Sequence, residues 1–186
     1  RLEFRPMKLK ALQILFITSA ILIWSCSEKG DTRPADTLLI DRAGILETIS
    51  ETLNNRLSLL RNDYGLEFVL ATIAELPPGE TIVELSARLF SQWNIGRNYG
   101  GQGLLLLLAD REKEIRLEVG MNMEGVFTDL FSGHIENKQL KSYFLSGQLE
   151  LGLIAVLEEI EARAALVALT EASADTIQAR DTAFLS

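Results

Sequence analysis

The chain has very few residues that could form covalent crosslinks or soft metal sites. It contains one cysteine and one histidine among 186 residues. A single cysteine cannot form an intrachain disulfide or a cysteine-based zinc site, and one histidine excludes any site that needs two imidazoles. Basic residues are also outnumbered, with 18 lysines and arginines against 26 aspartates and glutamates and a net charge of −8. This acidic balance argues against binding nucleic acid or anionic lipid head groups through charge.

The N-terminal part lacks an apolar run long enough to span a bilayer, which needs about 20 residues. The longest run, Ala11 to Trp24, follows the basic residues Lys8 and Lys10 and closes as "IWSC". This pattern is typical of an export signal, and its end resembles the lipobox of bacterial lipoproteins. We therefore predict a lipid on Cys26 as the mature N-terminus. An uncleaved anchor with an incidental thiol is the alternative interpretation.

This interpretation divides the chain into five parts. Residues 1–6 are upstream residues, 7–25 the lipoprotein signal peptide, 26–37 a polar tether, 38–170 the folded domain and 171–186 a tail, frayed beyond about residue 172. The predicted location is outside the cytoplasm, lipid-anchored in the bacterial envelope. In a diderm bacterium the residue after the cysteine, Ser27, would direct the protein to the outer membrane. Loss of residues 1–25 removes four basic and one acidic side chain, which makes the net charge about −11.

The hydrophobic pattern predicts alternating helices and strands in the domain. Apolar residues three and four positions apart mark helices, and short runs rich in leucine, valine and isoleucine mark strands. The predicted helices span about 45–64, 81–93, 127–135 and 149–164, and the predicted strands 66–73, 103–109 and 114–120. Five consecutive leucines in the second strand indicate a strand covered on both sides. Together these elements predict an α/β three-layer sandwich, in which a small mixed β-sheet is flanked by helices on both faces.

The glycine-rich stretch "NIGRNYGGQG" does not have the order of a phosphate-binding loop. Such a loop follows a strand and precedes a helix, whereas this one follows a helix and precedes a strand, and it lacks the lysine of a Walker motif. We expect these glycines to end the helix and to reverse the chain tightly.

Two glycine-containing loops should meet at one end of the sheet. If the first two predicted strands are parallel and the third runs back, "NIGRNYGGQG" and "GMNMEGVFTD" converge there. The polar side chains brought to that end are Asn98, Gln102, Glu118, Asn122, Glu124 and Asp129. Carboxylate and amide oxygens suit a hard cation, Ca²⁺ or Mg²⁺. We predict metal ligands among Glu118, Asn122, Glu124 and Asp129. The alternative for Glu124 and Asp129 is solvated carboxylates at a helix start.

Four motifs, in this order and spacing, resemble the TPM domain family. They are "LIDRAGILE", "LFSQWNIGRNYGGQGLLLLLA", "IRLEVGMNMEGVFTD" and "YFLSGQLELGL", and the resemblance covers about residues 39–162. It implies a small mixed sheet between helices. Some members are described as acid phosphatases that bind a divalent cation, others as factors in photosystem repair or receptor regulation. The matching positions are Asp41, Gly96, Gly103, Arg116, Glu118, Gly120, Glu124 and Asp129.

Several of these residues also have structural interpretations. Asp41 should lie at the opposite end of the sheet from Glu124 and cap the first helix. Arg116 and Glu118 should form an ion pair, and His134 should be a partly buried structural residue.

Two functions stay open. The first is an interaction or assembly module that recognises an envelope protein, in which any bound divalent cation is structural. The second is a phosphatase in which a metal-activated water hydrolyses phosphate esters.

Overall fold

The computed structural model describes residues 31–184, with side chains through Thr170. The predicted upstream residues, the signal peptide and Cys26 lie outside this range. From Pro34 onward the chain forms one unit. Among the described residues, no helix combines the length and the apolar character needed to cross a membrane.

The centre of the unit is a four-stranded mixed sheet in the order β1-β2-β3-β4. The strands are β1 (Leu39–Asp41), β2 (Glu67–Ile73), β3 (Gly103–Ala109) and β4 (Glu114–Val119). The first three are parallel, with Leu70 paired to Leu39 and to Leu106, and β4 is antiparallel to β3 with Leu106 opposite Leu117. Every residue of β3 is buried, which confirms that the leucine strand is covered on both sides.

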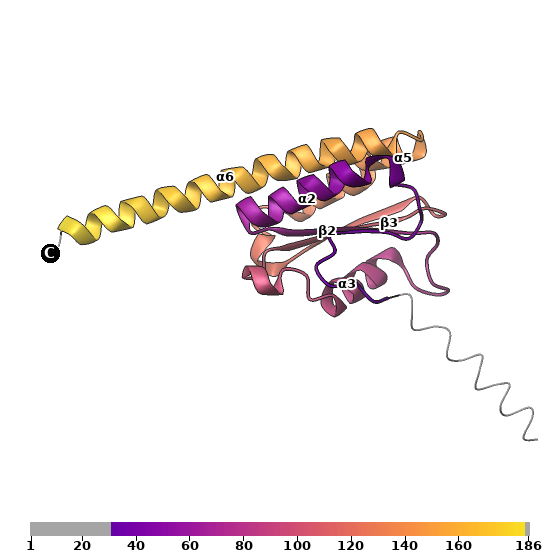
Figure 1. Cartoon of the computed structure of the whole chain (residues 1–186), viewed down its shortest axis with the longest axis horizontal. Coiled ribbons are helices and arrows are strands. Elements are labelled where there is room, and N and C mark those ends of the chain that lie inside the picture. Colours follow the sequence, from indigo (N-terminus) through magenta and orange to yellow (C-terminus); the bar gives the residue numbers. More distant parts are fainter. Residues whose placement is uncertain (1–30, 185–186) are drawn as a thin grey trace, which may run out of the picture. The chain divides into compact units, whose positions relative to one another are not determined.

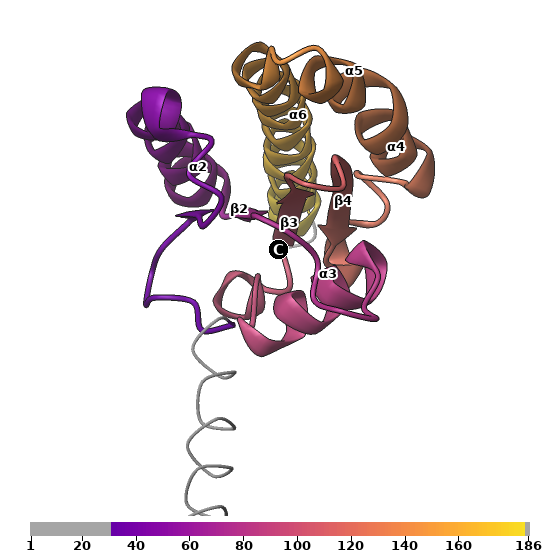
Figure 2. The ribbon, with the colours of Figure 1, turned by 90° about the vertical axis from the view of Figure 1, so that its right-hand side faces the viewer.

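Helices cover both faces of this sheet, as predicted. The helices are α2 (Ser50–Tyr64), α3 (Ile82–Gln92), α4 (Asp129–His134), α5 (Leu140–Leu145) and α6 (Leu149–Phe184). Short turns at Glu47–Ile49, Arg97–Tyr99 and Met121–Met123 are 3-10 helical. Figure 2 shows α2, α6 and α5 on one side of the sheet and α3 on the other. In Figure 1, α2 lies beside α6, and Arg56 of α2 pairs with Glu158 and Glu161 of α6.

The ends of the helices follow the sequence signals closely. Gly65 ends α2 in the left-handed conformation (φ 64°), a common stop because glycine has no Cβ to clash there. Thr81 and Glu84 form a capping box at the start of α3, in which each side chain binds a backbone N–H of the other residue. These local signals therefore place the two loops that precede β2 and α3.

Three expectations about the elements were wrong. The three-residue strand β1 was not predicted, because it is too short to show a pattern. The backbone of α6 continues to Phe184, where we expected a frayed tail. The segment after Gly125 is three helical pieces, with a π-helical turn, η4 (Ile135–Gln139), between α4 and α5.

The π turn has a physical reason in the spacing of the buried residues. Phe131 and Ile135 are four positions apart, Ile135 and Leu140 five, and Leu140 and Phe144 four, and all four residues are buried. The wider turn of a π-helix accommodates the step of five and keeps both halves facing the core. Leu130 points away from this buried row and is 85% exposed, although it lies three residues after the buried Phe127, the spacing that predicts a shared helix face.

Candidate functional site

The glycine loops converge at the end of the sheet where β3 begins and β4 ends. A Cβ on Gly96 would lie 2.6 Å from the Gly103 N, and a Cβ on Gly120 would lie 2.6 Å from the Gly101 O. The Gly120 N–H donates to the Gly103 O at 2.8 Å. The glycines thus allow three backbone segments to pack against one another. This close packing agrees with the prediction that the glycines reverse the chain tightly.

A buried carboxylate holds the first loop in place. Glu67, the first residue of β2, is 8% exposed, and its carboxylate accepts a hydrogen bond of 2.6 Å from the Gly96 N–H. A carboxylate bound to a backbone N–H forms one of the stronger hydrogen bonds in proteins. Sequence analysis missed Glu67. The signal available was an acidic residue at the start of an otherwise apolar strand.

An acidic cleft runs beside β4, the edge strand of the sheet. We call it the β4 cleft. Its volume is about 340 Å³, and its lining consists of Arg116, Leu117, Glu118, Val119, Glu124, Phe127, Asp129, Ser132, Gly133 and Glu136. Four of these residues are acidic and one is basic. Because α4 follows the loop after β4 directly, the chain brings Glu124 and Asp129 to the same cleft as Glu118.

An ion-pair network lies along one side of this cleft. The Arg116 Nε lies 3.2 Å from the Glu118 Oε2, and the Arg116 Nη1 lies 3.4 Å from the Glu136 Oε1. The first of these contacts confirms the predicted ion pair. The Ser86 hydroxyl of α3 donates to Glu118 at 3.2 Å. Glu118 is therefore held from both sides.

Glu136 is the most buried carboxylate of the cleft, and sequence analysis missed it. Its side chain is 12% exposed, and it accepts a hydrogen bond of 2.9 Å from the Leu117 N–H. That N–H faces outward because β4 has no further strand beside it. Burial raises the pKa of Glu136, and the Leu117 hydrogen bond and the charge of Arg116 oppose this shift.

The predicted metal ligands are only partly brought together. Glu118, Glu124 and Asp129 line the β4 cleft, but Asn122 donates its side-chain amide to the Gly100 O at 2.6 Å and is not part of the lining. Gln102 lines a separate small space with residues of α6. Asn98 lies exposed in the first loop.

The cleft has the donors that a hard cation prefers but no ready-made coordination shell. Among the side chains described, those of residues 31–170, no three acidic, histidine or cysteine residues are gathered as a metal site. Glu118 is occupied by Arg116 and Ser86, which leaves Glu124 and Asp129 as exposed ligands. A cation held by these two would need water to complete its shell. The Ca²⁺ or Mg²⁺ site stays a prediction.

Asp41 lies away from the cleft and organises a turn. Its two carboxylate oxygens accept from the Ile45 N–H at 3.2 Å and the Leu46 N–H at 2.8 Å, and the Thr72 hydroxyl donates to it at 2.5 Å. Asp41 ends β1, at the opposite end of the sheet from Glu124, as predicted. The carboxylate thus fixes the turn that leads toward α2. The prediction that it caps the helix was wrong, because the N-cap residues are Leu46 and Ile49 and neither helix start has a side-chain cap.

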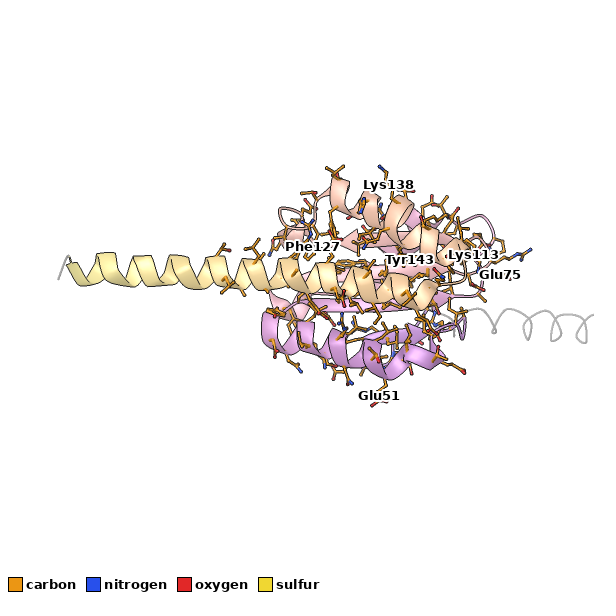
Figure 3. All side chains as sticks on the ribbon, turned by 90° about the horizontal axis from the view of Figure 1, so that it is seen from above. Glu51, Glu75, Lys113, Phe127, Lys138 and Tyr143 are labelled. Atoms are coloured by element: carbon orange, nitrogen blue, oxygen red, sulfur yellow. The ribbon has the colours of Figure 1, made fainter. Side chains whose placement is uncertain are left out.

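A second and larger hollow lies between α4 and α6. We call it the α4–α6 hollow. Its volume is about 640 Å³, and it is lined by Thr128, Asp129, Leu130, Phe131, Gly133, His134, Asn137, Lys138, Glu159 and Arg163. His134 is exposed, so the prediction of a partly buried histidine was wrong. Figure 3 shows Lys138 at the outer margin of the domain, on the segment beside α6.

Comparisons with known proteins were made against families, curated proteins and solved structures. A family described as "TPM domain" matches residues 39–163. No curated protein gives a significant match. Among solved structures, the chain is similar to the solution NMR structure of the N-terminal domain of a protein from P. gingivalis. The two share 27% sequence identity with a TM-score of 0.58, over 70% of this chain and 81% of that chain.

Proposed function

The chain belongs to the TPM domain family, and we propose that it acts as a protein-interaction module tethered to the bacterial membrane through a lipid on Cys26. The tether rests on the sequence pattern that ends in "IWSC". The polar residues that follow would give the domain reach from the membrane surface. The predicted partner is another protein of the envelope.

The observation that carries the interaction role is an exposed leucine at the α4–α6 hollow. Leu130 is 85% exposed at the rim of the hollow, whereas the neighbouring Phe131 is buried. A single exposed leucine is ordinary, but an exposed leucine at the rim of a hollow of this size is typical of a surface that a partner covers.

A photo-reactive amino acid at position 130, introduced in the living bacterium, tests this proposal. We expect a discrete crosslinked band that is absent when the same amino acid replaces Val83. Val83 is the matched control because it is apolar, 50% exposed and on α3, on the other face of the sheet. Equal crosslinking at both positions, or none at position 130, would remove the support for an interaction surface here.

The tether has a separate test. Cys26→Ala should move the protein from the membrane fraction to the soluble fraction of the envelope if the signal peptide is still cleaved at another site, or leave it as uncleaved precursor if it is not. A variant that fractionates and migrates like the parent would exclude lipidation at Cys26.

The second candidate is a divalent-cation-dependent phosphatase at the β4 cleft. It is favoured by the grouping of carboxylates with one arginine in a cleft of about 340 Å³. Glu124 and Asp129 would hold the cation, and Arg116, fixed by Glu118 and Glu136, would attract the phosphate. A bound cation would supply a Lewis acid that lowers the pKa of water.

Calcium and magnesium titrations combined with a hydrolysis assay separate this candidate from the first, because an interaction module could also bind a cation but would not hydrolyse phosphate esters. If the cleft binds a cation, the thermal midpoint should rise with CaCl₂ or MgCl₂, because a ligand of the folded state stabilises it. Glu124→Gln should abolish the rise and any hydrolysis of p-nitrophenyl phosphate. Glu51→Gln is the control, because Glu51 is an exposed carboxylate on α2, far in sequence from the residues of the cleft. This variant should keep both the thermal shift and any hydrolysis. A parent protein with neither a shift nor hydrolysis would exclude the phosphatase.

A further inference from the structure

The β4 cleft contains a buried hydroxyl group without a hydrogen-bond partner. Ser132 of α4 is 6% exposed and lines the cleft. Its hydroxyl group forms no hydrogen bond with any other residue in the part of the chain that the structure describes. The hydroxyl of Ser142, in contrast, donates to the Lys138 O at 2.7 Å. Because buried polar groups normally have a partner, a free hydroxyl in a cleft points to a ligand.

The position of Ser132 on its helix directs this hydroxyl into the cleft. Figure 2 shows α4 beside β4. Asp129, Ser132 and Glu136 are three and four positions apart, so they share one face of the helical segment, and all three line the cleft. The Glu136 carboxylate accepts from the Leu117 N–H, which shows that this face is directed at β4. The hydroxyl and the carboxylates therefore surround the same space.

The charges of the lining select a cation. Four acidic side chains and one basic side chain line the cleft. Glu118 and Glu136 share the guanidinium of Arg116, so the lining already holds one organic cation by ion pairs. Glu124 and Asp129 are exposed and form no ion pair with any side chain described. The uncompensated negative charge thus belongs to these two carboxylates.

The dimensions of the cleft favour an organic cation over a metal ion. Ca²⁺ and Mg²⁺ need several oxygens within about 2.0–2.6 Å of one point. Among the side chains described, no three potential ligands are gathered in this way. A primary ammonium group instead donates three hydrogen bonds of about 2.7–2.9 Å. The cleft volume of about 340 Å³ also lies within the range of small-molecule sites, whereas a single ion would leave most of it empty.

We propose that the β4 cleft binds a small organic molecule with a primary amino group. The ammonium group would donate hydrogen bonds to the carboxylates of Glu124 and Asp129 and to the hydroxyl oxygen of Ser132. Arg116 would stay paired with Glu118 and Glu136. This site goes beyond the proposed function, because partner binding at the α4–α6 hollow does not require it. It also differs from the phosphatase in the ligand of the cleft.

Isothermal titration calorimetry of the full chain in detergent micelles at pH 7 tests the class of ligand. Putrescine, a diamine, should bind saturably. Butanediol, which has the same carbon chain without charge, and tetramethylammonium, a cation without an N–H donor, should bind at least tenfold more weakly at equal ionic strength. Equal binding of tetramethylammonium, or no binding of putrescine, would overturn the proposal. Tighter binding of the acetylated and amidated peptide Gly-Ser-Lys-Ser-Gly would assign the site to a protein segment and also overturn it.

Variants then place the binding in the cleft. Ser132→Ala should weaken putrescine binding at least tenfold, because a hydrogen bond to a charged group is lost, and should not lower the thermal midpoint. Ser142→Ala is the matched control on α5, outside the lining, and should bind like the parent. Glu124→Gln should weaken binding at least tenfold, whereas Glu51→Gln, the same loss of charge on α2, should not. If Ser132→Ala binds like the parent, or Glu51→Gln weakens binding as much as Glu124→Gln, the proposal fails.

The remaining outcomes separate this inference from the proposed functions. Calcium that raises the thermal midpoint equally in the parent and in Ser132→Ala, without any response to putrescine, would assign the cleft to a metal ion and overturn the proposal. Absence of crosslinking at position 130 would remove the support for the interaction module. Putrescine binding that depends on Ser132 and Glu124 would still establish the amine site, because Leu130 does not line the cleft.

Discussion

Replacing Gly96 with alanine tests whether close backbone packing is the reason for the glycine loop. Gly96 has a φ of 78°, and an added Cβ would lie 2.6 Å from the Gly103 N. The left-handed conformation costs a residue with a Cβ about 1–2 kcal/mol, and forcing an extra carbon into packed structure costs about 1–3 kcal/mol. The free energy of unfolding should therefore fall by about 2–5 kcal/mol, measured by urea unfolding.

Two other glycines separate these contributions. Gly79 has a φ of 81° with nothing within 4 Å of an added Cβ, so Gly79→Ala should cost only the conformational part, about 1–2 kcal/mol. Gly103 lacks a positive φ, but its Cβ would lie 2.9 Å from the Gly96 Cα, so Gly103→Ala should cost only the packing part, about 1–3 kcal/mol. If Gly96→Ala were no more destabilising than Gly79→Ala, the loop would not be held by this contact and our explanation of the glycines would be wrong.

Three further predictions concern buried or capping groups. Glu67→Ala should lower the free energy of unfolding by about 1–3 kcal/mol in urea, because the buried Gly96 N–H loses its acceptor, and Glu67→Gln should cost less; equal costs would contradict this. Burial raises the pKa of Glu136, so its stabilising contribution is complete below the ordinary value of 4.5 and is lost as the pH rises through the raised pKa. The difference in unfolding free energy between Glu136→Gln and the parent should therefore shift in favour of the variant between pH 4 and pH 7. A difference that is the same at both pH values would contradict a raised pKa of Glu136. Thr81→Ala should cost about 1 kcal/mol through loss of the cap on the Glu84 N–H, and an unchanged thermal midpoint would argue against that role.

Local signals in the sequence predict most of the fold. The bounds of β3 are those expected, because a glycine and an aspartate enclose a continuous leucine run. The start of α3 and the end of α2 follow from a capping box and from a glycine that tolerates positive φ. The π turn could not be predicted in this way, because the step of five between Ile135 and Leu140 is visible only once the buried face is known.

The candidate site was less accessible to sequence reasoning than the fold. Topology correctly brought Glu118, Glu124 and Asp129 to one cleft, because strand direction decides which loops share an end of a sheet. It wrongly placed Gln102 with them, because this residue precedes β3 and lines a separate space beside α6. The contact of Glu136 with β4 depends on how a later helix packs against this edge strand. No residue spacing in the sequence predicts such a contact.

Both candidate functions involve the short helix α4, but each uses a different face of it. Only variants of residues that line one of the two sites can therefore distinguish the functions. Asp129 lines both the β4 cleft and the α4–α6 hollow, so a loss of activity or of partner binding in an Asp129 variant would be expected from either function. Glu124 lines only the cleft, whereas Leu130 and Lys138 line only the hollow. A phosphatase should lose hydrolysis with Glu124→Gln and keep it with Leu130→Ser, and an interaction module should show the reverse dependence in partner binding. Loss of both hydrolysis and partner binding in both variants would mean that α4 couples the β4 cleft to the α4–α6 hollow. The residues that line both sites belong to α4.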